Sequence, residues 1–166
     1  MVPTSGRKQG GMIDLKTAAE QFLKETRVAI AGVSRNHAET ANAIFTKFRD
    51  NGYTVYPVNP AATAVEGVKC YPSIKAIPGG VGAALLVTVP AVSAQVARDC
   101  IASGVKWVWM HRSFGDSVSP AAVKLLRDHG VGVIPGGCPM MFLDPDGFHK
   151  FACWSLQLIG RVPRTV

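Results

Sequence analysis

The sequence lacks the features that mark secreted, membrane-spanning and zinc-binding chains. Residues 1–12 are mostly polar and contain no apolar core of the kind that a secretory signal needs. No apolar run approaches the roughly 20 residues of a membrane-spanning helix. The four cysteines, at positions 70, 100, 138 and 153, form no Cys-x-x-Cys pair, which argues against a zinc ribbon or a dithiol motif. These absences predict a cytoplasmic protein with reduced thiols and no membrane partner.

Basic residues outnumber acidic ones but do not cluster. The chain has 18 Lys and Arg against 11 Asp and Glu, a net charge of +7, which favours anionic partners. The only local groups are Arg7 with Lys8, and Arg161 with Arg164. Aromatic residues do not alternate with the lysines, as a platform for single-stranded nucleic acid would require. We therefore interpret the scattered basic residues as a solvated surface and expect no nucleic-acid partner.

Strands and helices are predicted to alternate five times along the chain. Strands are expected at 27–32, 54–58, 83–89, 105–110 and 131–134, with a short strand near 68–70. Helices are expected from Asp14, over 38–51 and 91–103, and from Ser119 to Gly130, with a helical turn near 73–76. The strands are almost continuously apolar, as strands buried on both faces of a parallel sheet are. The pattern predicts an α/β fold: a Rossmann-like, doubly wound parallel sheet in a three-layer α/β/α arrangement.

The domain organisation is expected to be simple. No internal repeat and no second domain is evident in the 166 residues. We expect a flexible leader at 1–12, the Rossmann-like domain at 13–143, and a tail at 144–166 that packs on it. The apolar segment at 151–159 is expected to pack either internally or across a homodimer interface.

The ligand of such a sheet binds beyond the carboxyl ends of the strands, where the strand order reverses. This rule selects the residues that directly follow each main strand. They are Gly32, Val33, Ser34 and Arg35 after the first, Asn59 and Pro60 after the second, Thr88, Val89 and Pro90 after the third, Met110 and His111 after the fourth, and Cys138 and Pro139 after the last.

The turn at Gly32 suits a phosphate, but the nicotinamide fingerprint is only half present. Glycine lets the backbone approach a ligand, Ser34 supplies a hydroxyl, and the next helix offers free N–H groups at its N-terminus. A nicotinamide site would also need Gly-x-Gly-x-x-Gly and an acidic residue after the second strand. The chain has one glycine here, and its second strand ends in Tyr-Pro-Val-Asn-Pro. A phosphorylated ligand other than NAD or NADP is therefore favoured.

Four motifs occur together at the ends of four different strands. IAGVS follows the first strand, YPVNP the second, VTVP the third, and GGCP the last. In this order they resemble the small CoA-binding proteins, which are similar to the CoA-binding domain of the succinyl-CoA synthetase α-subunit. The resemblance covers about Arg27 to Met141.

The resemblance implies a domain that binds coenzyme A or acyl-CoA. It places Gly32, Val33 and Ser34 around the phosphates, and Asn59, Pro60 and the Thr88–Pro90 segment beside the nucleotide. Met110, His111, Cys138 and Pro139 fall near the same crevice. Many relatives carry basic residues where this chain has Ala43, Ala61 and Gly137. Arg35 and Arg112 are the candidates to replace them.

Catalysis has weaker support in the sequence than binding. The synthetases use a phosphorylated histidine on a further domain, so the resemblance does not carry ligation to this chain. Cys138 is a candidate for thiol chemistry with CoA, although a small buried cysteine in a tight turn is the preferred interpretation. Cys138, His149 and Cys153 match no familiar zinc spacing, so no metal is expected. The preferred interpretation is a binding protein, a sensor or carrier, without catalysis.

Three alternatives stay open: a nicotinamide-dependent oxidoreductase, a thiol-dependent enzyme acting through Cys138, and an accessory subunit of an acyl-CoA synthetase. A nicotinamide enzyme would bind that cofactor and transfer hydride. A thiol enzyme would lose activity in Cys138→Ser while still binding CoA. An accessory subunit would copurify with a larger chain.

Overall fold

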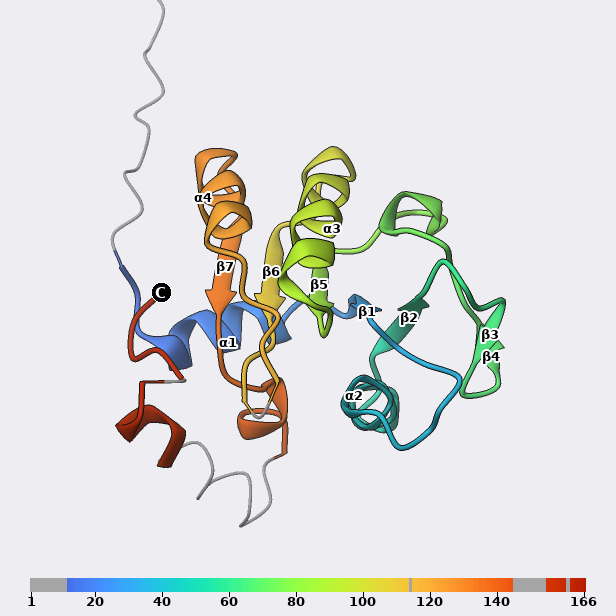
Figure 1. Cartoon of the computed structure of the whole chain (residues 1–166), viewed down its shortest axis with the longest axis horizontal. Coiled ribbons are helices and arrows are strands. Elements are labelled where there is room, and N and C mark those ends of the chain that lie inside the picture. Colours follow the sequence, from blue (N-terminus) through green and yellow to red (C-terminus); the bar gives the residue numbers. More distant parts are fainter. Residues whose placement is uncertain (1–11, 114, 145–154, 161) are drawn as a thin grey trace, which may run out of the picture.

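Five parallel strands form the central sheet of the protein. The structure is a computed structural model that describes residues 12–113, 115–144, 155–160 and 162–166. The strands are β1 (Arg27–Ala31), β2 (Thr54–Val58), β5 (Ala83–Leu86), β6 (Trp107–Met110) and β7 (Gly132–Pro135). Their order in the sheet is β2-β1-β5-β6-β7, and every neighbouring pair is parallel. The predicted Rossmann-like α/β fold is confirmed (Figure 1).

Helices cover both faces of this sheet. Helices α1 (Leu15–Leu23) and α2 (Thr40–Asp50) lie on one face, and α3 (Pro90–Ala102) and α4 (Pro120–Asp128) lie on the other (Figure 1). Successive side chains of a strand point to opposite faces, and here Ile30 belongs to the core under α1 and α2 while Ala29 belongs to the core under α3 and α4. Because both faces are covered, the strands are apolar throughout, as the sequence indicated.

Several element boundaries differ from the sequence prediction. Helix α2 begins at Thr40 instead of residue 38, because the Asn36 carboxamide accepts a hydrogen bond from Ala38 N and holds that residue in a turn. Strand β5 ends at Leu86, three residues before the expected end. The short strand expected near 68–70 is β4 (Val68–Lys69), which pairs antiparallel with β3 (Ala64–Val65). This hairpin was not predicted.

The predicted helix caps are present. The Asp14 carboxylate accepts a hydrogen bond from Thr17 N at 3.0 Å, and the Ser119 hydroxyl accepts one from Ala122 N at 3.3 Å. His129 is the C-cap of α4, as its position before Gly130 indicated, and its Nδ1 lies 2.8 Å from Leu125 O.

The last described residues return to the start of α1. Ile13 and Val166 exchange two backbone hydrogen bonds, of 3.0 and 2.9 Å. Leu156 and Val162 are buried in the core on the α1 face, beside the fully buried Trp109. Leu158 and Ile159 are largely exposed, and the homodimer stays a prediction. Among the described residues, no helix has the length and apolar character needed to cross a bilayer.

Candidate functional site

The strand order reverses between β1 and β5, and Gly32 lies at that point. The chain passes from β1 to β2 on one side and later to β5 on the other side. Gly32 directly follows β1 and has a φ of +100°. A Cβ atom built on it would lie 2.1 Å from the carbonyl oxygen of Val87, which follows β5. Only glycine fits here, so the backbone stays bare where a ligand can approach it.

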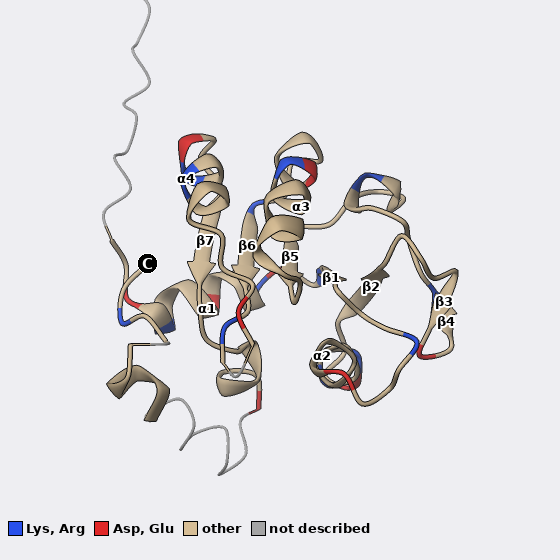
Figure 2. Cartoon of the chain, in the orientation of Figure 1, with Lys and Arg blue, Asp and Glu red and all other residues tan. Residues whose placement is uncertain are grey.

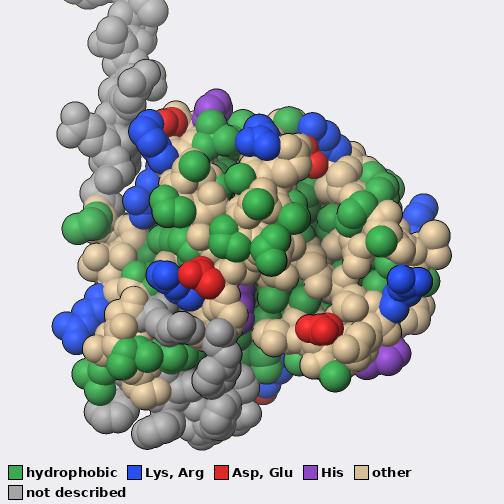
Figure 3. Space-filling view, viewed as in Figure 1, with side chains coloured by type: hydrophobic (Ala, Val, Ile, Leu, Met, Phe, Trp, Pro, Cys, Tyr) green, Lys and Arg blue, Asp and Glu red, His purple; other side chains and the backbone are tan. Residues whose placement is uncertain are grey.

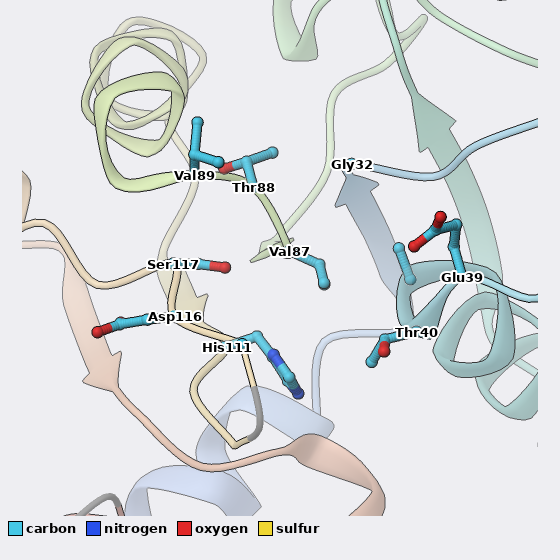
Figure 4. Close-up of a pocket in the computed structure, with 11 residues that line it drawn as sticks. Gly32, Glu39, Thr40, Val87, Thr88, Val89, His111, Asp116 and Ser117 are labelled. Atoms are coloured by element: carbon cyan, nitrogen blue, oxygen red, sulfur yellow. The ribbon is translucent and has the colours of Figure 1, made fainter.

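A cavity of about 250 Å³ opens on one side of this point. We call it the polar cavity. Its walls come from the end of β1, the first turn of α2, the segment after β5 and the loop after β6. The residues lining it are Gly32, Glu39, Thr40, Ala41, Val87, Thr88, Val89, His111, Gly115, Asp116 and Ser117. Figure 4 shows the His111 ring projecting toward the beginning of α2, where Thr40 lies.

A second cavity, of about 360 Å³, opens on the α3 side of the same point. We call it the apolar cavity, because valines, prolines and an isoleucine make up much of its wall. The residues lining it are Ala31, Gly32, Val58, Asn59, Pro60, Pro72, Ser73, Ile74, Thr88, Val92, Gln95, Val96 and Asp99. Gly32 and Thr88 line both cavities, so the two spaces adjoin at the reversal point.

Hydrogen bonds hold the segments that carry the predicted residues. The Asn59 side chain donates to Val33 O at 2.7 Å and accepts from Ala61 N at 2.8 Å, which ties the end of β2 to the turn after β1. The hydroxyls of Thr88 and of the buried Ser93 lie 2.7 Å apart and fasten the start of α3. These bonds fix the cavity walls before any ligand arrives.

The polar cavity contains a buried histidine. His111 is 3% exposed, and its Nε2 lies 3.1 Å from the Ser113 hydroxyl. Burial lowers the pKa of His111 to about 4, because the imidazolium would lose its hydration. At neutral pH this side chain is therefore a neutral imidazole that can exchange hydrogen bonds with a ligand but carries no positive charge.

The structure separates the predicted site residues into three groups. Gly32, Asn59, Pro60, Thr88, Val89 and His111 line the cavities. Ser34 and Arg35 lie in the following loop, Arg35 exposed to solvent, and Pro90 begins α3. Val33, Met110, Cys138 and Pro139 are buried and line neither cavity.

Cys138 is poorly suited to nucleophilic chemistry. It is 6% exposed, and burial raises the pKa of its thiol to about 11, so the reactive thiolate is scarce at neutral pH. The other two residues of the weighed metal set, His149 and Cys153, lie outside the described residues. Within the described part of the chain, no three Cys, His, Asp or Glu side chains gather as a metal site would require.

Several cavity residues escaped the sequence analysis. Glu39 and Thr40 begin α2, Asp116 and Ser117 lie in the loop after β6, and Gln95 is inside α3. A search limited to the residues directly after each strand cannot find them. The first turns of the following helices offered a usable signal, since they point at the same edge of the sheet.

Charged residues surround the cavities without forming a basic cluster. Of the described residues lining the two cavities, none is Lys or Arg, whereas Glu39, Asp99 and Asp116 are acidic. Asp99 pairs with Lys75 at 2.9 Å and Asp116 with Arg112 at 3.0 Å. Figure 2 shows charged residues distributed over separate helices and loops. Apolar side chains instead gather across the middle of the face over α3 and α4 (Figure 3).

Comparison with known proteins identifies relatives of this chain. The family model described as a CoA binding domain matches residues 26–144. The ADP-forming acetate–CoA ligase II subunit alpha of Pyrococcus furiosus is 33% identical over 127 residues, which are 72% of this chain and 28% of that subunit. The uncharacterized protein YneT of Bacillus subtilis is 28% identical over 122 residues, 72% of this chain and 86% of that protein. This chain thus spans little more than a quarter of the ligase subunit.

A solved structure shares the fold over most of the chain. The hypothetical protein from Pyrococcus horikoshii OT3 is 26% identical, with a TM-score of 0.73, and the match covers 87% of this chain and 97% of that one. The sequence motifs and these matches indicate the same family. The reversal point between β1 and β5 is the place where ligands of such a sheet bind.

Proposed function

The chain belongs to the CoA binding domain family, and from this premise we propose that it binds coenzyme A, free or acylated, across the two adjoining cavities. The observation that carries the proposal is their meeting at Gly32 and Thr88, at the reversal point of the sheet. Ligands of doubly wound sheets bind at this place. A long ligand with chemically different halves suits two joined spaces of different character.

The proposed orientation of coenzyme A follows from the chemical character of the two cavities. The adenine ring enters the apolar cavity, between Pro60, Ile74 and Val96. The diphosphate crosses the bare backbone at Gly32, beside the N-terminus of α2, whose free N–H groups and partial positive charge favour an anion. The pantetheine arm then lies along Val87 and Val89 in the polar cavity, with the thiol end toward His111. Val89 is 63% exposed, and the arm would cover it.

The proposal is tested by calorimetric titration of the purified protein with coenzyme A, using NAD and NADP as control ligands at one moderate salt concentration. We expect micromolar binding of coenzyme A and no heat with the nicotinamide cofactors. Absence of coenzyme A binding would refute the proposal. Binding of NAD alone would favour the oxidoreductase instead.

The place of binding is tested by Val92→Glu. Val92 lines the apolar cavity and is 46% exposed, so the substitution adds a carboxylate beside the bound nucleotide without disturbing the core. We expect coenzyme A affinity to fall about tenfold, through repulsion of the ligand phosphates and loss of apolar contact. Ala102→Glu, at the far end of the same helix, is the matched control with the same charge change. Equal affinities of the two variants would place the ligand elsewhere.

A second candidate is an accessory role beside an acyl-CoA synthetase. The matched Pyrococcus furiosus protein is named as a subunit of an acetate–CoA ligase, and this chain corresponds to 28% of it. In that role the chain would still bind coenzyme A but would also copurify with a larger chain. Size-exclusion chromatography of the natural complex distinguishes this candidate from a free sensor or carrier.

A further inference from the structure

A buried asparagine holds the turn that follows Gly32. Asn42, in the first turn of α2, is 1% exposed. Its carbonyl oxygen Oδ1 accepts a hydrogen bond from Ser34 N at 2.8 Å, and its Nδ2 donates to Ser34 O at 2.7 Å. The amide thus bonds both backbone groups of one residue, as a neighbouring strand would. This fixes the direction of the chain as it leaves β1.

A carboxylate from a distant hairpin sets the orientation of this amide. Glu66 Oε1 accepts a hydrogen bond from Asn42 Nδ2 at 2.8 Å, and His37 Nδ1 lies 2.8 Å from the same oxygen. Both hydrogens of Nδ2 are therefore used, one by Ser34 O and one by Glu66. A flipped Asn42 amide would turn its oxygen toward the Glu66 carboxylate and its NH2 group toward Ser34 N. The Ser34 N–H and carbonyl group oppose that arrangement, and the Glu66 carboxylate, which can only accept, opposes it further.

Hairpin chemistry alone does not explain a glutamate at this position. Glu66 and Gly67 form the two-residue connection between β3 and β4, and their φ angles are +51° and +77°. Such connections favour Asn-Gly or Asp-Gly, because few other residues tolerate a positive φ. Glutamate is strained there, and a strained residue that persists points to a use for its side chain. The Glu66 side chain is only 17% exposed and faces Asn42 rather than solvent.

We propose that Glu66 is a positioning residue for the ligand: through Asn42 it holds the turn from Gly32 to Ser34 in the conformation that receives the phosphates of coenzyme A. The inference rests on the proposed function. Figure 1 shows the loop between β1 and α2 extending to the β3–β4 hairpin, which brings these parts together. Positioning the turn in advance removes an ordering cost from binding.

The same contacts decide which groups of Ser34 a phosphate can meet. The Ser34 N–H is already bonded to Asn42, so it is not a phosphate donor. The Ser34 hydroxyl oxygen accepts a hydrogen bond from Asn36 N at 3.1 Å, which leaves the hydroxyl hydrogen to donate. In the proposed complex the Ser34 hydroxyl therefore donates to the phosphate, while Asn42 fixes the conformation of the Ser34 backbone.

The test compares Glu66→Asn with Glu66→Gln in the full chain. Both substitutions remove the same negative charge, but only glutamine is long enough to place an oxygen on Asn42. Asparagine suits the positive φ better, which offsets the lost hydrogen bond of the buried Asn42 Nδ2, so the melting temperature of Glu66→Asn is expected to stay close to wild type. Its affinity for coenzyme A is nevertheless expected to fall about tenfold, whereas Glu66→Gln stays within about threefold of wild type.

Amide hydrogen exchange of Ser34 in the ligand-free protein provides an independent readout. Exchange is expected to be faster in Glu66→Asn and nearly unchanged in Glu66→Gln. Equal affinities and equal Ser34 exchange in the two variants would overturn the positioning role while leaving the proposed function intact. A wild-type chain that does not bind coenzyme A would instead refute the proposed function, and the ligand role of Glu66 with it.

Discussion

At the scale of single residues, Gly32 carries the strictest requirement in the site. It combines a φ of +100° with a Cβ position 2.1 Å from Val87 O. We expect Gly32→Ala to lower the free energy of unfolding by about 3 kcal/mol or more, because backbone strain and a steric clash add together. Chemical denaturation measures the loss.

Gly52→Ala is the matched control for this prediction. Gly52 has a φ of +85°, and a Cβ built on it has nothing within 4 Å. An alanine at this position is therefore strained but does not clash. We expect Gly52→Ala to lower the free energy of unfolding by about 1 kcal/mol. Similar losses for the two variants would show that conformation alone requires glycine at position 32, and that the close approach of Val87 does not matter.

We expect the stability of the protein to depend on pH through His111. Its pKa is about 4 in the folded protein and near the ordinary 6.5 in the unfolded chain. The unfolded state thus binds the proton more tightly. The stabilisation is complete above pH 6.5 and is lost as the pH falls toward 4.

We expect His111→Gln to remove this part of the pH dependence. Between pH 7 and pH 4.5, the wild type should lose about 2 kcal/mol more unfolding free energy than the variant. Urea unfolding of both proteins at both pH values measures the difference, in which the contributions of other groups cancel. An identical loss in the two proteins would contradict a neutral, buried His111.

Some of the residues that the sequence selected line the two cavities, and others lie outside them. Gly32, Thr88 and His111 reach the cavities because the carboxyl ends of parallel strands share one edge of the sheet. Met110, one residue before His111, packs in the core under α3 and α4 and lines neither cavity, since consecutive side chains along an extended chain face opposite ways. The contact between Asn42 and Glu66 joins residues 24 positions apart, and no local sequence pattern predicts it.

At the scale of elements, apolar runs and helix caps predicted the existence of each main element, while boundaries depended on tertiary contacts. Strand β2 was predicted with its observed bounds, Thr54–Val58. The run Val87–Val89 is as apolar as a strand, yet β5 ends before it because the chain turns there toward α3. Strand β3 and its pairing with β4 were not predicted, because a two-residue strand is too short to show a period of two.

At the scale of the whole molecule, the positive net charge of the chain contrasts with the absence of basic side chains among the described residues lining the cavities. The chain carries +7 overall, yet no Lys or Arg is among the described residues lining either cavity. In the proposed complex, long-range attraction would bring the anionic ligand to the protein, and close phosphate contacts would depend on backbone groups, hydroxyls and loop residues such as Arg35. Binding of this kind is expected to be modest in affinity and sensitive to added charge.

Ala61→Lys tests this balance between overall and local charge. Ala61 is exposed and directly follows Pro60, which lines the apolar cavity. Its backbone N–H bonds to Asn59, so the side chain can change without loss of that contact. We expect the affinity for coenzyme A to rise about fivefold at low salt, and the gain to shrink as salt screens the new charge.

Ala102→Lys, at the exposed end of α3, adds the same charge away from both cavities and is the control for this gain. Adenosine, which has no phosphate, should bind wild type and Ala61→Lys equally. Titration of each variant with both ligands separates a local phosphate contact from general attraction. If Ala102→Lys improved coenzyme A binding as much as Ala61→Lys, the overall charge would govern affinity, and the rim at residue 61 would not contact the phosphates.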